Sequence, residues 1–142
     1  MDELLENESL QCMATYLISV FQLLCFSIYS DYHCTKQTLL QNNPHLRRTF
    51  PRSPFTVVTA NLGPVSVSSP HTDTTNKADS MCLITALGTF DPDQGGHLVC
   101  WDYNLLIRFP PGCSALCCST DLFLAHYRQN SSAGKSTSGA IT

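Results

Sequence analysis

The chain has few charged residues and no excess of basic ones. Charged side chains make up 13% of its 142 residues, apolar ones make up 43%, and the formal net charge is −3. This balance excludes an intrinsically disordered chain, which needs low hydrophobicity and high charge. The missing basic excess excludes broad binding of a phosphate backbone, so any nucleic-acid contact must come from a local patch. The only dense basic cluster is Arg47, Arg48 and Arg52.

The chain also lacks a paired cysteine framework and an uninterrupted hydrophobic span. Its eight cysteines show no CxxC spacing, and residues 1–8 are acidic where a secretory signal would be basic. We therefore expect an intracellular protein whose cysteines are reduced and mostly buried. In residues 10–29, polar residues interrupt apolar ones that recur every three or four positions, which predicts a packed amphipathic helix. A single membrane anchor is the alternative interpretation.

Helical patterns fill the first third of the chain, and strand patterns follow them. We predict one helix over about residues 7–31 and a shorter one over 36–41. Short strands are predicted at 55–60, 65–68, 81–87, 97–101 and 104–109, with another starting at 115. Strands this short, separated by turn signals, indicate an antiparallel sandwich or barrel in an α+β protein. The tail from residue 130 is expected to be weakly ordered.

The stretch His71-Thr72-Asp73 has the spacing of two metal ligands. On an extended chain, residues two apart point to the same side, so this imidazole and this carboxylate can reach one ion. A second histidine would complete the two-His-one-carboxylate set that leaves open positions on iron(II). His126, which lies late in the β region, is a better candidate for it than His97. The simpler alternative is that Asp73 caps a turn and His71 is solvated.

Several blocks together resemble one family. The sequences PHTDTTN (70–76), CLITALGTFDPDQGGHLVCWDYNLLIRFPPG (82–112) and a downstream AHY are similar to the fungal TET/JBP-like branch of the 2-oxoglutarate- and iron(II)-dependent dioxygenases. The upstream segment 43–64 also resembles the one that these proteins carry before the motif. The resemblance covers residues 10–126, and its blocks occur in the family's order.

The resemblance implies a fold and an activity. The fold is a double-stranded β-helix, which is a jelly-roll of the cupin type, with the N-terminal helices packed on its outside. His71, Asp73 and His126 would be the iron ligands, and a basic residue, Lys135 or Arg128, would bind the far carboxylate of 2-oxoglutarate. The substrate would be the methyl group of 5-methylcytosine or thymine in DNA, with the base flipped out of the helix. This activity would make the protein nuclear.

The family pattern also suggests roles for other parts of the chain. Residues 1–142 would form a single domain: 1–43 as helical support, 44–129 as the β-helix core with the metal motif, and 130–142 as a weakly ordered or truncated tail. Asn76 and Asn61 are candidates for substrate binding, although turn chemistry also explains both. Contact with DNA phosphates would come from the arginine cluster, for which a solvated loop is the alternative.

Two departures from the family pattern keep other functions open. The stretch between Gly112 and His126 is about two residues longer than expected, and Lys135 stands where the family has an arginine with a bidentate fork. The first alternative is therefore an inactive or truncated β-helix remnant that acts, if at all, as a binding module. The second is a related dioxygenase that acts on a protein or a small molecule.

Overall fold

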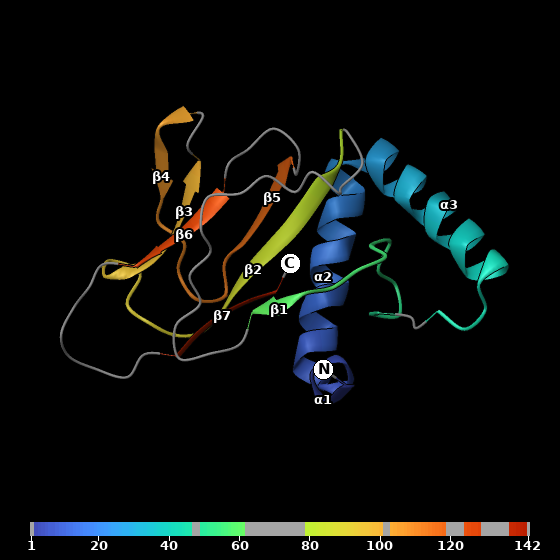
Figure 1. Cartoon of the computed structure of the whole chain (residues 1–142), viewed down its shortest axis with the longest axis horizontal. Coiled ribbons are helices and arrows are strands. Elements are labelled where there is room, and N and C mark those ends of the chain that lie inside the picture. The colour runs from blue at the N-terminus through green and yellow to red at the C-terminus, as the bar shows by residue number, and fades with distance from the viewer. Residues whose placement is uncertain are drawn as a thin grey trace. The chain divides into compact units, whose positions relative to one another are not determined.

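A computed structural model gives the fold of residues 2–46, 49–61, 79–100, 103–118, 124–128 and 137–141. For residue 2 and for the last two of these ranges only the backbone is described. The chain divides into two compact units, residues 1–58 and 59–142. The first contains the helices and the second contains the strands, as the α+β pattern of the sequence predicts (Figure 1).

The first unit contains α1 (Asp2–Glu6), α2 (Glu8–Leu24) and α3 (Phe26–Asn42). Asn7 begins α2, because its side-chain oxygen accepts a hydrogen bond from the Leu10 N–H at 3.1 Å and so satisfies a free donor of the first turn. The buried positions of α2 are Ala14, Ile18 and Phe21, which recur every three or four residues. None of the described helices is long and apolar enough to cross a membrane.

The single helix predicted over residues 7–31 is wrong, because the chain breaks at Cys25 and then continues helically as far as Asn42. The break brings α3 back toward Phe21, whose ring lies 6.1 Å from that of Tyr29 and 6.0 Å from that of Tyr32. In a continuous helix, Phe21 and Tyr29 would be about 12 Å apart along the axis. The aromatic contacts that the break allows, which include a stacked Phe55 ring at 5.3 Å, explain the bend.

The segment after α3 packs in this first unit and is held there by a buried lysine. Lys36 Nζ donates to the carbonyl oxygen of Ser53 at 2.6 Å, to that of Phe55 at 3.0 Å and to Thr49 Oγ1 at 3.3 Å. Phe50 and Val58 pack against the buried face of α2. These contacts explain why the strand predicted over 55–60 does not form before Ala60: its first residues belong to the helical unit.

The second unit contains two antiparallel sheets. The first has the order β1-β7-β2-β5, formed by β1 (Ala60–Asn61), β7 (Thr137–Ile141), β2 (Met81–Thr89) and β5 (Ser114–Cys118). The second has the order β4-β3-β6, formed by β4 (Leu105–Ile107), β3 (Gly95–Cys100) and β6 (Leu124–Arg128). The strands predicted at 81–87, 97–101, 104–109 and 115 correspond to β2, β3, β4 and β5, whereas β7 lies in the tail where no strand was predicted.

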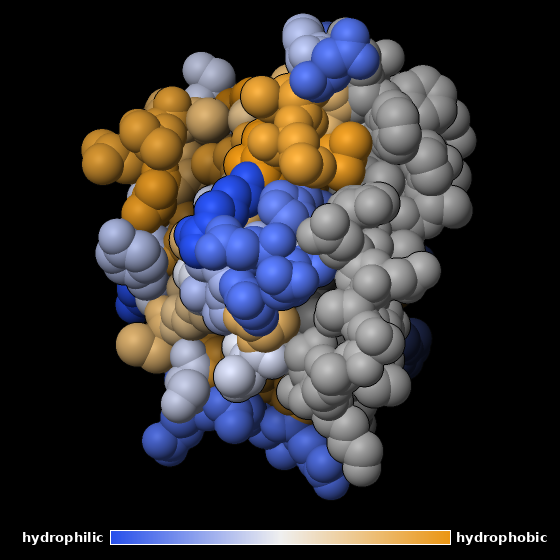
Figure 2. Space-filling model, turned by 90° about the vertical axis from the view of Figure 1, so that its left-hand side faces the viewer, coloured by the Kyte–Doolittle hydropathy of each residue, from blue (hydrophilic) through white to orange (hydrophobic). Residues whose placement is uncertain are grey.

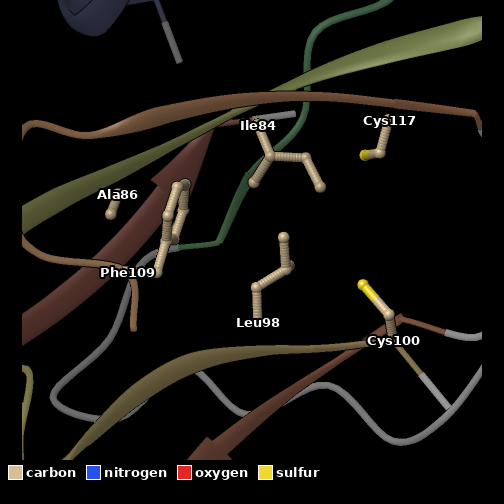
Figure 3. Packing of buried hydrophobic residues seen from close by; sticks show 6 residues of the cluster. All are labelled: Ile84, Ala86, Leu98, Cys100, Phe109 and Cys117. Carbon is tan, nitrogen blue, oxygen red and sulfur yellow. The ribbon is translucent and has the colours of Figure 1, made fainter. Parts of the chain in front are cut away.

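One apolar core lies between these sheets (Figure 3). Ile84, Ala86 and Cys117 enter it from the first sheet, and Leu98 and Cys100 enter it from β3. Phe109, between β4 and β5, is 4% exposed and closes one side. The described strands form two separate sheets that share this core. The double-stranded β-helix stays a prediction.

Candidate functional site

The turn before β3 determines how this strand is placed. The Asp91 side chain accepts a hydrogen bond from the Asp93 N–H at 2.9 Å, and the Asp91 carbonyl accepts one from the Gln94 N–H at 3.1 Å. Gly96 follows with a φ of +73°, in the left-handed region that favours glycine. A Cβ atom at this position would also overlap the Phe90 ring, so two independent constraints require glycine here.

Gly96 forms a β-bulge in the pairing of β3 with β6. Gly95 is the register partner of Arg128 and His97 is that of Tyr127, so one residue of β3 is extra between them. A bulge with glycine in the left-handed conformation shifts the register of every later pair by one. As a result, position 126 is paired with Leu98.

This register distinguishes the two histidines considered as distal iron ligand. Register partners lie on the same face of a sheet, and successive residues of a strand lie on opposite faces. Leu98 is 2% exposed and points into the core between the sheets, so position 126 is on the core-facing side of its sheet. His97 is on the other side. The backbone therefore favours His126 over His97 for a site inside the β unit.

His97 is nevertheless in an unusual environment. It is half-buried, and its Nδ1 atom has no hydrogen-bond partner among the residues that the structure describes. In the turn before it, a hydrogen bond from Arg108 and the positive charge of that guanidinium lower the pKa of Asp93. Arg108 Nε and Asp93 Oδ1 are 2.5 Å apart on the surface. This ion pair joins the turn before β3 to the end of β4.

Most of the predicted site lies outside the described residues. This applies to His71, Asp73 and Asn76 of the metal and substrate motif, to Lys135, and to Arg47 and Arg48. His126 and Arg128 are on β6, where the backbone alone is described. Asn61 is an exposed residue of β1, paired with Ala140 of β7, and Arg52 is exposed in the turn after Phe50. Within the described ranges, no three His, Cys, Asp or Glu side chains form a group that could hold a metal ion.

The surface around β4 is apolar. β4 is at the edge of its sheet, and Leu105 and Leu106 are 49% and 57% exposed, next to Tyr103 at 71%. Figure 2, which views the molecule from the side where this sheet lies, shows apolar surface above a polar band.

The cysteines differ from what the sequence predicted. None of the eight is in a disulfide, but only Cys100 and Cys117 are buried, while four are exposed: Cys12, Cys34, Cys113 and Cys118. The expectation that most are buried is therefore wrong. Cys82 and Cys117 are register partners on β2 and β5, with their sulfur atoms 3.3 Å apart. The sequence predicted both strands, but no sequence signal gives the register between positions 35 residues apart.

No family model matches the sequence, and no curated protein matches it significantly.

Proposed function

We propose that the chain is an iron(II)- and 2-oxoglutarate-dependent dioxygenase of the TET/JBP type, which oxidises the methyl group of 5-methylcytosine or thymine in DNA. The observation that carries the proposal is the order of the sequence blocks PHTDTTN, FDPDQGGHLVCWD, FPPG and AHY along one chain. A His-x-Asp pair alone is common, whereas these four blocks in this order are much more specific.

The strand arrangement supports the proposal in two ways. Two antiparallel sheets share one apolar core, which is the basic layout that a double-stranded β-helix requires. The bulge at Gly96 puts position 126 on the core-facing side of β6, where a ligand of an internal metal has to be. Both observations concern the backbone and the core. The metal motif itself enters the proposal from the sequence.

The donor set fits iron(II). His71 and His126 would supply imidazole nitrogens and Asp73 a carboxylate oxygen, the combination that leaves positions for a co-substrate and O2. When bound, iron with 2-oxoglutarate and O2 supplies the oxidation of the methyl C–H bond, and 2-oxoglutarate leaves as succinate and CO2. Lys135 or Arg128 would bind the far carboxylate of 2-oxoglutarate. Lysine would do this as a point charge and arginine as a bidentate fork.

The other predicted residues would bind and position the nucleic acid. Asn76 and Asn61 would donate and accept hydrogen bonds at the edge of a flipped pyrimidine. Arg47, Arg48 and Arg52 would contact phosphates, which would make DNA binding weaken as the salt concentration rises. With DNA as the substrate, the protein would act in the nucleus.

The first experiment measures iron binding by the full chain. Under anaerobic conditions, one iron(II) per chain is expected to bind, and both His71→Ala and Asp73→Ala should abolish binding. His45→Ala, which removes an exposed histidine of the helical unit, is the matched control and should leave binding unchanged. If iron does not bind, or if it binds equally well to His71→Ala, the metal assignment is wrong and a non-catalytic remnant is favoured.

The second experiment measures turnover. The chain is loaded with iron(II) and supplied with ascorbate, O2 and 2-oxoglutarate. It should release succinate and an oxidised base from a duplex that carries a methyl-bearing pyrimidine at the target site. A control duplex that differs only in having a pyrimidine without a methyl group at that site should give no oxidised base. Iron binding with succinate release but without an oxidised base would transfer the proposal to a protein or small-molecule substrate. If iron binds but no succinate is released with either duplex, the enzymatic function is refuted.

A further inference from the structure

Cys82 and Cys117, in the described part of the strand unit, form a close pair of thiols. They are register partners on β2 and β5, and their Sγ atoms are 3.3 Å apart. Each sulfur also lies within hydrogen-bond reach of the other residue's carbonyl oxygen, at 3.6 Å from Cys82 and 3.9 Å from Cys117. Both side chains therefore lie on the same face of the sheet and point toward each other.

The backbone at this pair suits a covalent bond between the sulfurs. Cys82 and Cys117 are directly opposite each other in the ladder of β2 and β5. Residues opposite each other in an antiparallel pair have Cα atoms about 4.5–5.5 Å apart. Disulfides span Cα distances of about 4.4–6.8 Å. The sulfurs would have to approach by about 1.2 Å to reach the bonded distance of about 2.05 Å.

The two thiols differ in accessibility. Cys82 is half-buried, whereas Cys117 is 9% exposed and belongs to the apolar core. The hydrogen bond with Cys82 and burial raise the pKa of the Cys117 thiol, so it stays protonated. An oxidant from solvent would therefore react first at Cys82, and Cys117 would be the sulfur that completes the bond.

We propose that Cys82 and Cys117 are a site of reversible disulfide formation, with a peroxide as the oxidant. In the first step the Cys82 thiolate attacks one peroxide oxygen and the O–O bond breaks. This gives a sulfenic acid at Cys82 and a hydroxide that takes up a proton as water. In the second step the Cys117 sulfur attacks the Cys82 sulfur, the S–O bond breaks, and the leaving hydroxide takes the Cys117 proton as water. The two sulfurs together lose two electrons, which reduce one peroxide to two waters.

The disulfide would fix an edge of the first sheet. β5 is an edge strand, and β2 is its only neighbour among the described strands. A covalent bond near one end of the ladder prevents β5 from separating from β2 at that end. This inference does not depend on the proposed dioxygenase activity.

The test uses the full chain with its four exposed cysteines replaced by serine: the changes are Cys12→Ser, Cys34→Ser, Cys113→Ser and Cys118→Ser. The thiols that remain are the pair, half-buried Cys25 in the other unit and buried Cys100. After limited peroxide treatment, peptide mapping without reduction should show a Cys82–Cys117 linkage as the dominant product, which dithiothreitol reverses. Adding Cys82→Ser should abolish the linkage and leave Cys117 as a free thiol. Adding Cys25→Ser, which removes another half-buried thiol in the other unit, should leave it unchanged.

A different pattern of oxidation would overturn the proposal. A dominant Cys100–Cys117 linkage would do so, because Cys100 enters the same core from β3 (Figure 3). Conversion of Cys82 to a sulfinic acid while Cys117 stays a thiol would also overturn the proposal, because it would mean that the Cys117 sulfur does not attack the Cys82 sulfur. The same mapping on the unsubstituted chain guards against a folding defect of the serine variants. There too the Cys82–Cys117 linkage is expected, and its absence would count against the pair.

Discussion

Replacing Gly96 by alanine should destabilise the β unit through two separate effects. The φ of +73° is left-handed, which costs a residue with a Cβ atom about 1–2 kcal/mol. The new methyl group would also overlap the Phe90 ring, and overpacking of this kind costs about 1–3 kcal/mol. The sum predicts that Gly96→Ala lowers the free energy of unfolding by about 2–5 kcal/mol.

Gly112 offers the matched control. Its φ is +81°, but a Cβ atom there would meet nothing within 4 Å, so Gly112→Ala should cost only the conformational term of about 1–2 kcal/mol. Urea unfolding of both variants, followed by the fluorescence of the single tryptophan, Trp101, measures the difference. Equal destabilisation of the two variants would show that the Phe90 contact does not constrain this position. No destabilisation of either would refute the backbone argument.

Two further predictions concern charged groups. Lys36→Met should lower the free energy of unfolding of the helical unit by about 2–4 kcal/mol and speed hydrogen exchange in residues 49–55, because the buried Ser53 carbonyl loses its donor. Gln37→Met, at an exposed position of the same helix, is the control. An unchanged urea midpoint for Lys36→Met would mean that burying the ammonium costs as much as its hydrogen bonds contribute. Arg108→Gln should raise the pKa of Asp93 toward its ordinary value of 3.8, as an NMR titration would measure. Because the folded pKa of Asp93 is lowered, its ion pair with Arg108 stabilises the chain at pH values above 3.8 and stops doing so as the pH falls through the folded pKa. The free energies of unfolding of the variant and the parent should therefore converge in acid. A difference that stays constant with pH would contradict the assignment of this ion pair.

The strands that the sequence predicted are those whose own composition determines them. The run at 81–87 is apolar except for Thr85, and it is buried or half-buried on both faces of β2: Ile84 and Ala86 lie in the shared core, and Thr85 on the other face is 3% exposed. β2 extends only two residues beyond this run, to Thr89. β7 could not be predicted in this way. Its residues, Thr137–Ile141, are mostly small and polar, and they form a strand because the edges of β1 and β2 are available for pairing on either side.

The helical unit shows the same limit. The apolar stripe of α2 predicted a helix beginning at Asn7, and the side chain of that residue does cap it. The break at Cys25 was not predicted, because no proline or glycine occurs there. It results from rings in three segments, with Phe21 contacting Tyr29, Tyr32 and Phe55. Contacts between residues so far apart in sequence override the local helical pattern, which taken alone continues through residue 25.

The candidate site depends on one such non-local feature. Without the bulge at Gly96, pairing from Gly95 and Arg128 would set His97 opposite His126, and both would lie on the side of the sheet away from the core. The extra residue moves position 126 opposite Leu98 and so to the core-facing side. The sequence alone could not show that Gly96 selects the face on which His126 lies. If the proposed function is correct, Gly96→Ala should therefore reduce iron binding more than its cost in stability explains, whereas Gly112→Ala should not.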